Sequence, residues 1–206
     1  MTIPIINAAT VMPEQAYKAF MRFVPQGTPN TAPVFGEYTS YDVLNVILPA
    51  YWVVCDRAGI DFGVALAQAW HETAANGIPF SSWWAQRPRR NPCGFGVTGR
   101  VEMSAIPPSG VWARKGLRWA EGHSFANWRD YAIPAHVGRL VAYATKPGQR
   151  TGVQQELAAY ALGLRGLPAG YIGAAPTLDG LGGRWAVPGN GYGAKIARIM
   201  QAMRGL

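Results

Sequence analysis

The chain has 206 residues, of which 49% are hydrophobic and 15% charged, so a globular fold with a sizeable core is expected and a disordered chain is excluded. The 19 basic residues outnumber the 11 acidic ones, and the net charge of +8 favours a polyanionic partner such as a bacterial envelope polymer. Two cysteines are too few for a disulfide framework, so both are expected to be free thiols.

The N-terminal part is predicted to hold one short helix and a long loop. Apolar residues recur at helical spacing from Pro13 to Phe23, whereas residues 24–37 are rich in proline and glycine and have no period. We therefore predict an N-terminal extension, residues 1–39, packed on a main domain, residues 40–206. The first residues lack the basic and apolar regions of a Sec signal peptide, so synthesis in the cytoplasm is expected.

The first helix of the main domain is predicted from capping residues. Ser40 and Asp42 can cap a helix that runs towards Arg57, and Gly59 can end it. Pro49 is expected to kink this helix. Its apolar stretch is shorter than the roughly 20 residues that span a bilayer, so no membrane insertion is expected.

A second helix is predicted from Asp61, as its cap, to about Thr73. Gln68 and Glu72 lie one turn apart on the same face, and His71 is expected to point away from that face. A carboxylate at the end of an apolar helix, facing glycine-rich loops, can have a raised pKa and act as a general acid. A glutamate there is unfavourable for the helix dipole, which suggests a reason other than stability. The alternative is an ordinary solvated residue at a helix end.

The remaining elements complete a mainly α (α+β) fold. The helical period disappears between residues 76 and 122, where glycines punctuate short β-prone runs, and a small β-lobe is predicted at about 90–120. Helices return from Ser124 to Ala144, from Thr151 to Leu164 and from Tyr192 to Met203. We expect an α-rich body with a cleft beside the lobe.

Four segments carry recognisable motifs: GVALAQAWHET at 63–73, NPCGFGV at 91–97, SFANW with AHVGRL between 124 and 140, and GRWAVP with YGAKI between 183 and 196. In this order they resemble the glucosaminidase family of the lysozyme-like superfamily. The resemblance runs from about residue 41 to the C-terminus. It departs at 189–191, where the family often has an acidic residue and a proline before its tyrosine.

The resemblance implies a lysozyme-like body with a β-lobe and a cofactor-free, metal-free glycoside hydrolase. Its substrate would be bacterial peptidoglycan, cut as an endo-β-N-acetylglucosaminidase does at the β-1,4 bond after N-acetylglucosamine. Glu72 would be the general acid, and Tyr192 is a further catalytic candidate. A bacteriolytic phage or prophage lysin acting on the wall as a monomer fits these expectations.

The second catalytic group has several candidates. A partner carboxylate lies about 5–5.5 Å away in retaining enzymes and about 6.5–9.5 Å away in inverting ones, whereas other enzymes use the acetamide of the substrate. Glu102 in the lobe is the first choice, followed by Glu121 and Asp130. An exposed strand charge is the competing interpretation of Glu102.

Aromatic and amide side chains are the candidates for sugar binding, because flat apolar faces stack on sugar rings. Trp83 and Trp84 are expected to form a wall of the cleft, and core packing is their alternative. Asn91 can donate to an acetamide or cap its own loop. The substrate-binding candidates are Gln68, Trp83, Trp84, Asn91, Phe95 and Trp185.

Other functions fit the sequence less well. A lytic transglycosylase or muramidase of the same fold would use the same glutamate, and a non-catalytic wall-binding or virion domain could retain the fold. His71 and Glu72 do not belong to a His-Glu-x-x-His zinc motif, so a zinc amidase is disfavoured. The basic cluster at 87–90 is held in a loop by prolines, so nucleic acid is not the expected partner.

Overall fold

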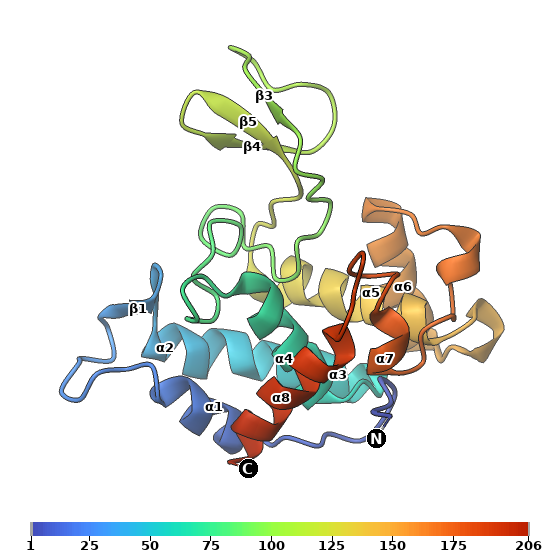
Figure 1. The fold of residues 1–206 in the computed structure, drawn as a ribbon, viewed down its shortest axis with the longest axis horizontal. Coiled ribbons are helices and arrows are strands. Elements are labelled where there is room, and N and C mark those ends of the chain that lie inside the picture. The colour runs from blue at the N-terminus through green and yellow to red at the C-terminus, as the bar shows by residue number, and fades with distance from the viewer. Residues whose placement is uncertain (1, 206) are drawn as a thin grey trace.

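The computed structural model describes residues 2–205 and has the predicted mainly α (α+β) fold. A helical body surrounds α4, and a small sheet stands above it (Figure 1). The elements are α1 Pro13–Met21, β1 Pro33–Phe35, β2 Tyr38–Thr39, α2 Ser40–Asp42, a π-helix Val43–Ile47, α3 Leu48–Ala58, α4 Phe62–Thr73, β3 Val101–Glu102, β4 Trp112–Lys115, β5 Arg118–Glu121, a π-helix Trp128–Ala132, α5 Ile133–Ala144, a 3-10 helix Pro147–Gln149, α6 Gly152–Leu164, a 3-10 helix Ala169–Tyr171, α7 Leu178–Leu181 and α8 Tyr192–Arg204.

The helix predicted from Ser40 to Arg57 is present, but its cap and its irregularity differ from the prediction. Thr39 is the cap, because its hydroxyl accepts a hydrogen bond from the Asp42 amide at 3.0 Å. A π-helical turn separates α2 from α3, and Pro49 follows it near the start of α3. Gly59 ends α3 with φ 64°, as predicted.

α4 is the central helix of the body. Nine consecutive residues, Phe62–Trp70, are buried, as is Thr73, so the helix is covered on all sides. Asp61 caps it as predicted by accepting from the Gly63 amide at 2.8 Å. The same carboxylate accepts from the Thr10 amide and hydroxyl at 3.0 and 2.7 Å, which fixes the N-terminal segment beside the start of α4.

The helix predicted from Ser124 begins later. Asn127 is the cap and accepts from the Asp130 amide at 2.7 Å, and a π-helical turn leads into α5. Ser124 therefore lies in the preceding loop. α6 is capped by Thr151 as predicted, and it packs closely on α5 at Gly138, where any Cβ would collide with the backbone of Leu157.

The predicted β-lobe is a three-stranded antiparallel sheet in the order β3–β5–β4, which projects from the body (Figure 1). The sequence also offers a β-prone run at 95–98, but residues 95–96 form a turn and residues 97–98 have no regular structure. Met103, Ile106 and Leu117 are 71%, 73% and 76% exposed, so these apolar side chains of the lobe remain in solvent rather than forming a core.

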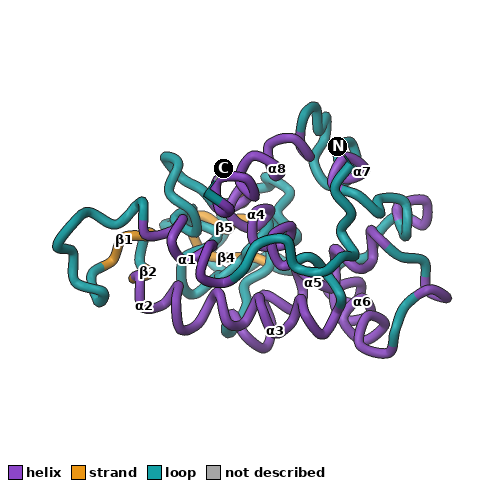
Figure 2. Tube along the Cα trace, turned by 90° about the horizontal axis from the view of Figure 1, so that it is seen from below, coloured by secondary structure: helices purple, strands orange, loops and turns teal. Residues whose placement is uncertain are grey.

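The N-terminal residues are integrated into the core. Ile5, Phe20 and Phe35 are fully buried in one apolar cluster that also contains side chains from every later part of the body. A β1–β2 hairpin, which the sequence did not predict, lies at one end of the helical layer, and α6 and α7 lie towards the other (Figure 2).

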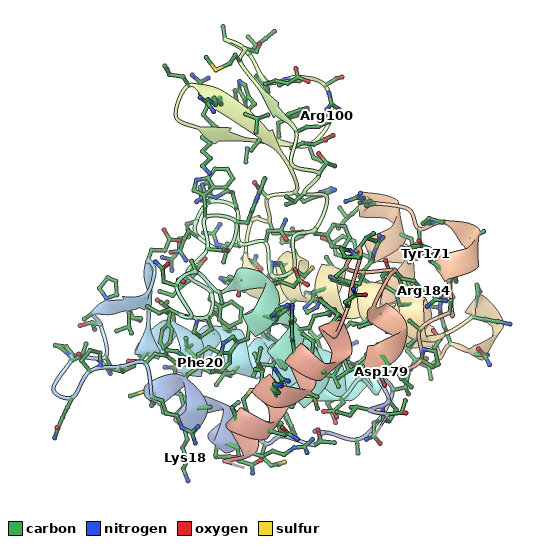
Figure 3. The ribbon with its side chains drawn as sticks, in the orientation of Figure 1. Lys18, Phe20, Arg100, Tyr171, Asp179 and Arg184 are labelled. Carbon is green, nitrogen blue, oxygen red and sulfur yellow. The ribbon has the colours of Figure 1, made fainter. Side chains whose placement is uncertain are left out.

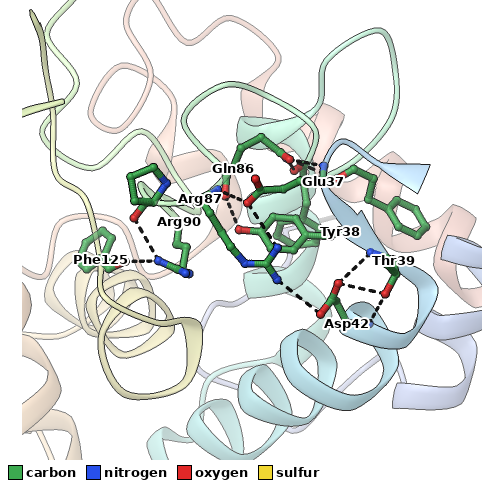
Figure 4. A network of polar contacts seen from close by, with 12 residues as sticks. Glu37, Tyr38, Thr39, Asp42, Gln86, Arg87, Arg90 and Phe125 are labelled. Carbon is green, nitrogen blue, oxygen red and sulfur yellow. Dashed lines mark hydrogen bonds and ion pairs between the residues drawn. The ribbon is translucent and has the colours of Figure 1, made fainter. Parts of the chain in front are cut away.

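The basic cluster at 87–90 holds neighbouring segments together. Arg87 forms ion pairs with Glu37 at 3.7 Å and Asp42 at 3.6 Å, and Arg90 donates to the Phe125 carbonyl at 3.3 Å (Figure 4). Arg89 donates to the Trp83 carbonyl at 2.5 Å. These arginines therefore join the hairpin, α2 and the segment before α5 to one loop.

Two further features concern the part of the chain from residue 2 to 205. No helix there combines the length and the apolar character needed to cross a membrane. Cys55 and Cys93 are both buried and unpaired, as predicted.

Candidate active site

Glu72 lies at the C-terminal end of α4, where two neighbouring cavities meet. One has a volume of about 380 Å³ and the other about 310 Å³, and Glu72 and Ala186 line both. The larger of the two is lined by Glu72, Cys93, Gly94, Phe95, Gly96, Val97, Arg139, Tyr143, Arg165, Trp185 and Ala186. The smaller is lined by His71, Glu72, Ala186, Val187, Pro188, Gly189, Asn190, Tyr192 and Lys195. The carboxylate therefore stands at the junction of an open groove that continues on both sides.

A cavity of about 710 Å³ lies against α3, α5 and α6, away from this groove. Asp130 lines it, together with Arg57, Arg129 and Glu156, and Glu72 does not. The candidate site is centred on Glu72 because its groove combines a half-buried carboxylate with aromatic and cationic side chains.

Burial raises the pKa of the Glu72 carboxyl, whereas hydrogen bonds from Tyr192 and Trp185 oppose the shift. The Tyr192 hydroxyl donates to Oε1 of Glu72 at 2.5 Å. The opposing effects leave the acid with a net upward shift, which favours the protonated form that a general acid needs.

A chain of buried hydrogen bonds extends from Glu72 into the core. Nε2 of Gln68 donates to the Tyr192 hydroxyl at 2.9 Å, and Oε1 of Gln68 lies 2.8 Å from Nε2 of His136. On the far side of the ring, Nδ1 of His136 lies 2.8 Å from the Tyr51 hydroxyl. Gln68, His136 and Tyr51 are all fully buried.

The chemistry of these groups determines which atom donates and which accepts in each of these hydrogen bonds. Burial lowers the pKa of His136 to about 3, so the ring is neutral and carries one N–H. Because the amide oxygen of Gln68 can only accept, that N–H is on Nε2, and Nδ1 accepts from Tyr51. The Gln68 N–H then occupies the Tyr192 oxygen, and the Tyr192 O–H is left to donate to Glu72. We call these five residues, Tyr51, His136, Gln68, Tyr192 and Glu72, the buried relay.

His71 does not point away from the groove, so that prediction was wrong. It lines the smaller cavity with Glu72, and its ring lies 5.6 Å from the ring of Tyr192. α8 brings Tyr192 and Lys195 across the end of α4, so adjacent residues of α4 face the same cavity. Burial lowers the pKa of His71, and the charge of Lys195 lowers it further.

Asn91 shapes the loop that enters the groove. Its side-chain amide donates to the carbonyls of Phe95 and His123 at 2.8 and 3.1 Å, and its oxygen accepts from the Phe95 amide at 2.7 Å. Gly96 adopts φ 72°, and a Cβ there would collide with the His123 ring. Asn91 is fully buried, so it caps the loop and places Phe95 in the cavity rather than contacting a ligand.

Of the other predicted sugar-binding residues, Trp185 and Phe95 line the groove, whereas Trp83 and Trp84 do not. The rings of Trp83 and Trp84 pack edge to face, with their centres 4.7 Å apart. The guanidinium carbon of Arg89 lies 4.0 Å from the ring centre of Trp83. Gln68 is fully buried and contacts Tyr192 rather than the cavity. Substrate binding by these residues remains a prediction.

The candidate partner carboxylates lie outside the two cavities. Glu102 pairs with Arg100 at 2.7 Å in the lobe, which Figure 3 shows standing apart from the body. Glu121 accepts from the Thr98 hydroxyl and lies 3.7 Å from the same arginine. Within residues 2–205, Glu72 is the only carboxylate that lines either cavity.

Several residues of the site were not predicted. Arg139, Tyr143, Arg165 and Lys195 line the groove, and His136 holds the buried relay. The sequence offered one signal: His136 and Arg139 belong to the segment that resembles the family's third motif. No group of three or more His, Cys, Asp or Glu residues among 2–205 is placed to hold a metal ion.

No known protein family matches this chain, and no curated protein matches it at a significant level. Among solved structures, the chain is similar to the catalytic domain of the autolysin Auto from Listeria monocytogenes, with a TM-score of 0.44. The sequence identity is 16%, over 93% of this chain and 96% of that one. At these values the similarity carries no functional conclusion, which has to come from the chain's own residues.

Proposed function

We propose that this protein is a peptidoglycan hydrolase that cleaves the glycan strand after N-acetylglucosamine, with Glu72 as its general acid. The observation that carries the proposal is a half-buried carboxyl with a raised pKa at the junction of two cavities, held by the Tyr192 hydroxyl at 2.5 Å. The motif resemblance supplies the substrate class, and the net charge of +8 suits an anionic wall.

The open groove suits an endo-acting enzyme. A glycan strand that crosses Glu72 occupies the larger cavity on one side and the smaller cavity on the other. Trp185 offers apolar surface to the sugar rings in the larger cavity. Glu72 then transfers its proton to the glycosidic oxygen as the bond from that oxygen to the anomeric carbon breaks.

We assign the second role to the acetamide of the substrate. Among the described residues, no carboxylate other than Glu72 lines the two cavities. The protein therefore offers no second carboxylate beside Glu72 to act as nucleophile or base. The acetamide oxygen attacks the anomeric carbon, and the leaving sugar takes the proton of Glu72. Water then opens the cyclic intermediate, with Glu72 as the base that accepts its proton.

A lytic transglycosylase is the second candidate, because it also needs one carboxylic acid in the groove. The two reactions leave different ends on the glycan. Hydrolysis after N-acetylglucosamine gives a reducing N-acetylglucosamine, whereas transglycosylation gives an anhydromuramic end.

Mass spectrometry of purified walls digested with the protein tests the proposal. We expect new reducing N-acetylglucosamine ends, and reduction with borohydride should label them. Anhydromuramic ends would assign the second candidate, and reducing muramic ends would indicate a muramidase. Wall binding by the wild-type protein without new ends would instead indicate a non-catalytic binding domain.

A further inference from the structure

Two arginines line the larger cavity beside Glu72 and have no assigned role. Arg139 comes from α5, and Arg165 follows the end of α6. Both therefore face the half of the groove that also contains Phe95 and Trp185.

Arg139 is held in a fixed orientation. Its Nη1 donates to the carbonyls of Arg165 and Gly166 at 2.5 and 3.3 Å. Its guanidinium carbon lies 5.4 Å from the ring centre of Phe95 and 5.6 Å from that of Tyr143. Two aromatic rings and two carbonyls thus position a planar cation at the cavity, without using all five of its N–H groups.

Among the described residues, neither arginine has a carboxylate partner. The ion pairs among residues 2–205 all involve Arg87 or Arg100. Burial lowers the pKa of Arg139, and the neighbouring charge of Arg165 lowers it further, although Tyr143 opposes the shift. A half-buried cation next to a second cation is unfavourable in the free protein, and an anion bound between them relieves the repulsion.

The proposed substrate carries anions at regular intervals. In peptidoglycan every second sugar bears a lactyl ether, which ends in a carboxylate or continues into a peptide with its own carboxylates. N-acetylglucosamine, the sugar in between, is neutral. The fork of an arginine side chain matches the geometry of a carboxylate.

We propose that Arg139 and Arg165 form a carboxylate-binding subsite for the acidic substituent of the muramic sugar beside the scissile bond. This inference rests on the proposed function and deepens it. The subsite makes the enzyme prefer wall glycan to a neutral polymer of N-acetylglucosamine, although both polymers offer the same acetamide and the same type of bond.

Cleavage of three glycans of equal length tests the subsite: wall glycan with its peptides, the same glycan after amidase treatment, which carries free lactyl carboxylates, and a neutral chito-oligosaccharide. We expect kcat/KM for the acidic glycans to exceed that for the neutral one by about tenfold. A larger preference for the peptide-bearing form assigns the peptide carboxylates, and a larger preference for the stripped form assigns the lactyl group.

Arg139→Gln and Arg165→Gln should each lower this preference by about fivefold. Arg198→Gln is the matched control, because it removes one positive charge from an exposed position on α8 outside both cavities. The subsite would be overturned if Arg139→Gln and Arg165→Gln preferred acidic to neutral glycan as strongly as the wild type does. The exposed position of Arg165 keeps the test valid if Arg139→Gln fails to fold.

Binding to a Glu72→Gln variant separates this inference from the proposed function. If the wild type cuts none of the glycans, the function fails, but the subsite still predicts about tenfold tighter binding of the acidic glycan by the variant. Equal affinities would reject the subsite. Tighter binding of a glycerol phosphate oligomer than of the lactyl glycan would reject a carboxylate as the ligand.

Discussion

The polar groups behind the Glu72 groove are buried and hydrogen-bonded to one another, whereas those of the β-lobe pair in solvent. Behind the groove, Gln68 and His136 are fully buried, and each is hydrogen-bonded on both sides. In the lobe, Arg100 and Glu102 pair in solvent, with side chains 62% and 41% exposed. A buried network fixes positions and shifts pKa values, whereas an exposed pair is screened by water. The comparison supports the proposal that Glu72, which adjoins the buried network, is the acid.

The largest effect on activity is expected at the end of the buried relay. Glu72→Gln keeps the shape of the side chain but removes its acid, so wall lysis should fall by about 10²- to 10⁴-fold. Lysis by a folded Glu72→Gln protein at the wild-type rate would refute the proposed acid. Turbidity loss of wall suspensions measures the rate.

The same variant should also be more stable in alkali. The pKa of the Glu72 carboxyl is raised in the folded protein, so the folded state holds this proton to a higher pH than the unfolded state does. The folded state therefore loses stability as the pH rises from the unfolded pKa of Glu72 through its folded pKa. Glutamine has no such loss. The melting temperature of Glu72→Gln should exceed that of the wild type at about pH 8, and the difference should vanish in acid.

Tyr192→Phe should have the next largest effect on activity. It removes the donor to Glu72 and leaves the Gln68 N–H unpaired, so we expect a loss of about 10- to 100-fold in kcat. Because the lost hydrogen bond lowered the pKa of Glu72, the alkaline limb of the pH–rate profile should move to higher pH. Tyr131→Phe, at an exposed tyrosine, is the control. An unmoved alkaline limb would contradict the role of Tyr192.

His136→Leu should affect stability more than chemistry. It leaves Tyr51 and Gln68 without their buried partner, which costs roughly 2–5 kcal/mol of unfolding free energy at neutral pH. Urea denaturation measures the loss. Tyr51→Phe is the matched variant, because it removes only the first hydrogen bond and should cost less.

The pH dependence of the unfolding free energy gives a second test of His136. The pKa of His136 is about 3 in the folded protein and near 6.5 in the unfolded chain. The unfolded state therefore binds the extra proton, and stability falls by roughly 1.4 kcal/mol per unit as the pH drops from about 6 to 4. The leucine variant should lack this slope. An identical slope in both proteins would place the sensitive group elsewhere.

The smallest effects are expected in the lobe. Glu102→Gln and Glu121→Gln should each change stability by less than about 1 kcal/mol, because their pairing with Arg100 is weak in solvent. Activity should stay within about twofold of the wild type. A loss of about 100-fold in either variant would make that carboxylate the missing partner and would reject acetamide assistance.

The sequence by itself determined the local features of this protein. Asp61, Gly59 and Thr151 predicted helix ends correctly, because a cap depends on hydrogen bonds to residues a few positions away. Glu72 was proposed as the acid from its place at the end of an apolar helix together with the motif resemblance. The π-helical turns were missed, since their effect on hydrogen bonding is not visible in a pattern of apolar residues.

The motifs named Tyr192, Phe95 and Trp185 as candidates, but tertiary structure decided how the side chains around Glu72 contact one another. Tyr192 is 120 residues away in sequence, and His136 is 68 residues from Gln68. No local pattern shows that α8 crosses the end of α4 or that α5 buries a neutral histidine against it. The direction of His71, the commitment of Asn91 to its own loop and the two arginines in the groove all depend on that packing. The sequence located the proposed acid, and contacts between distant segments established its environment.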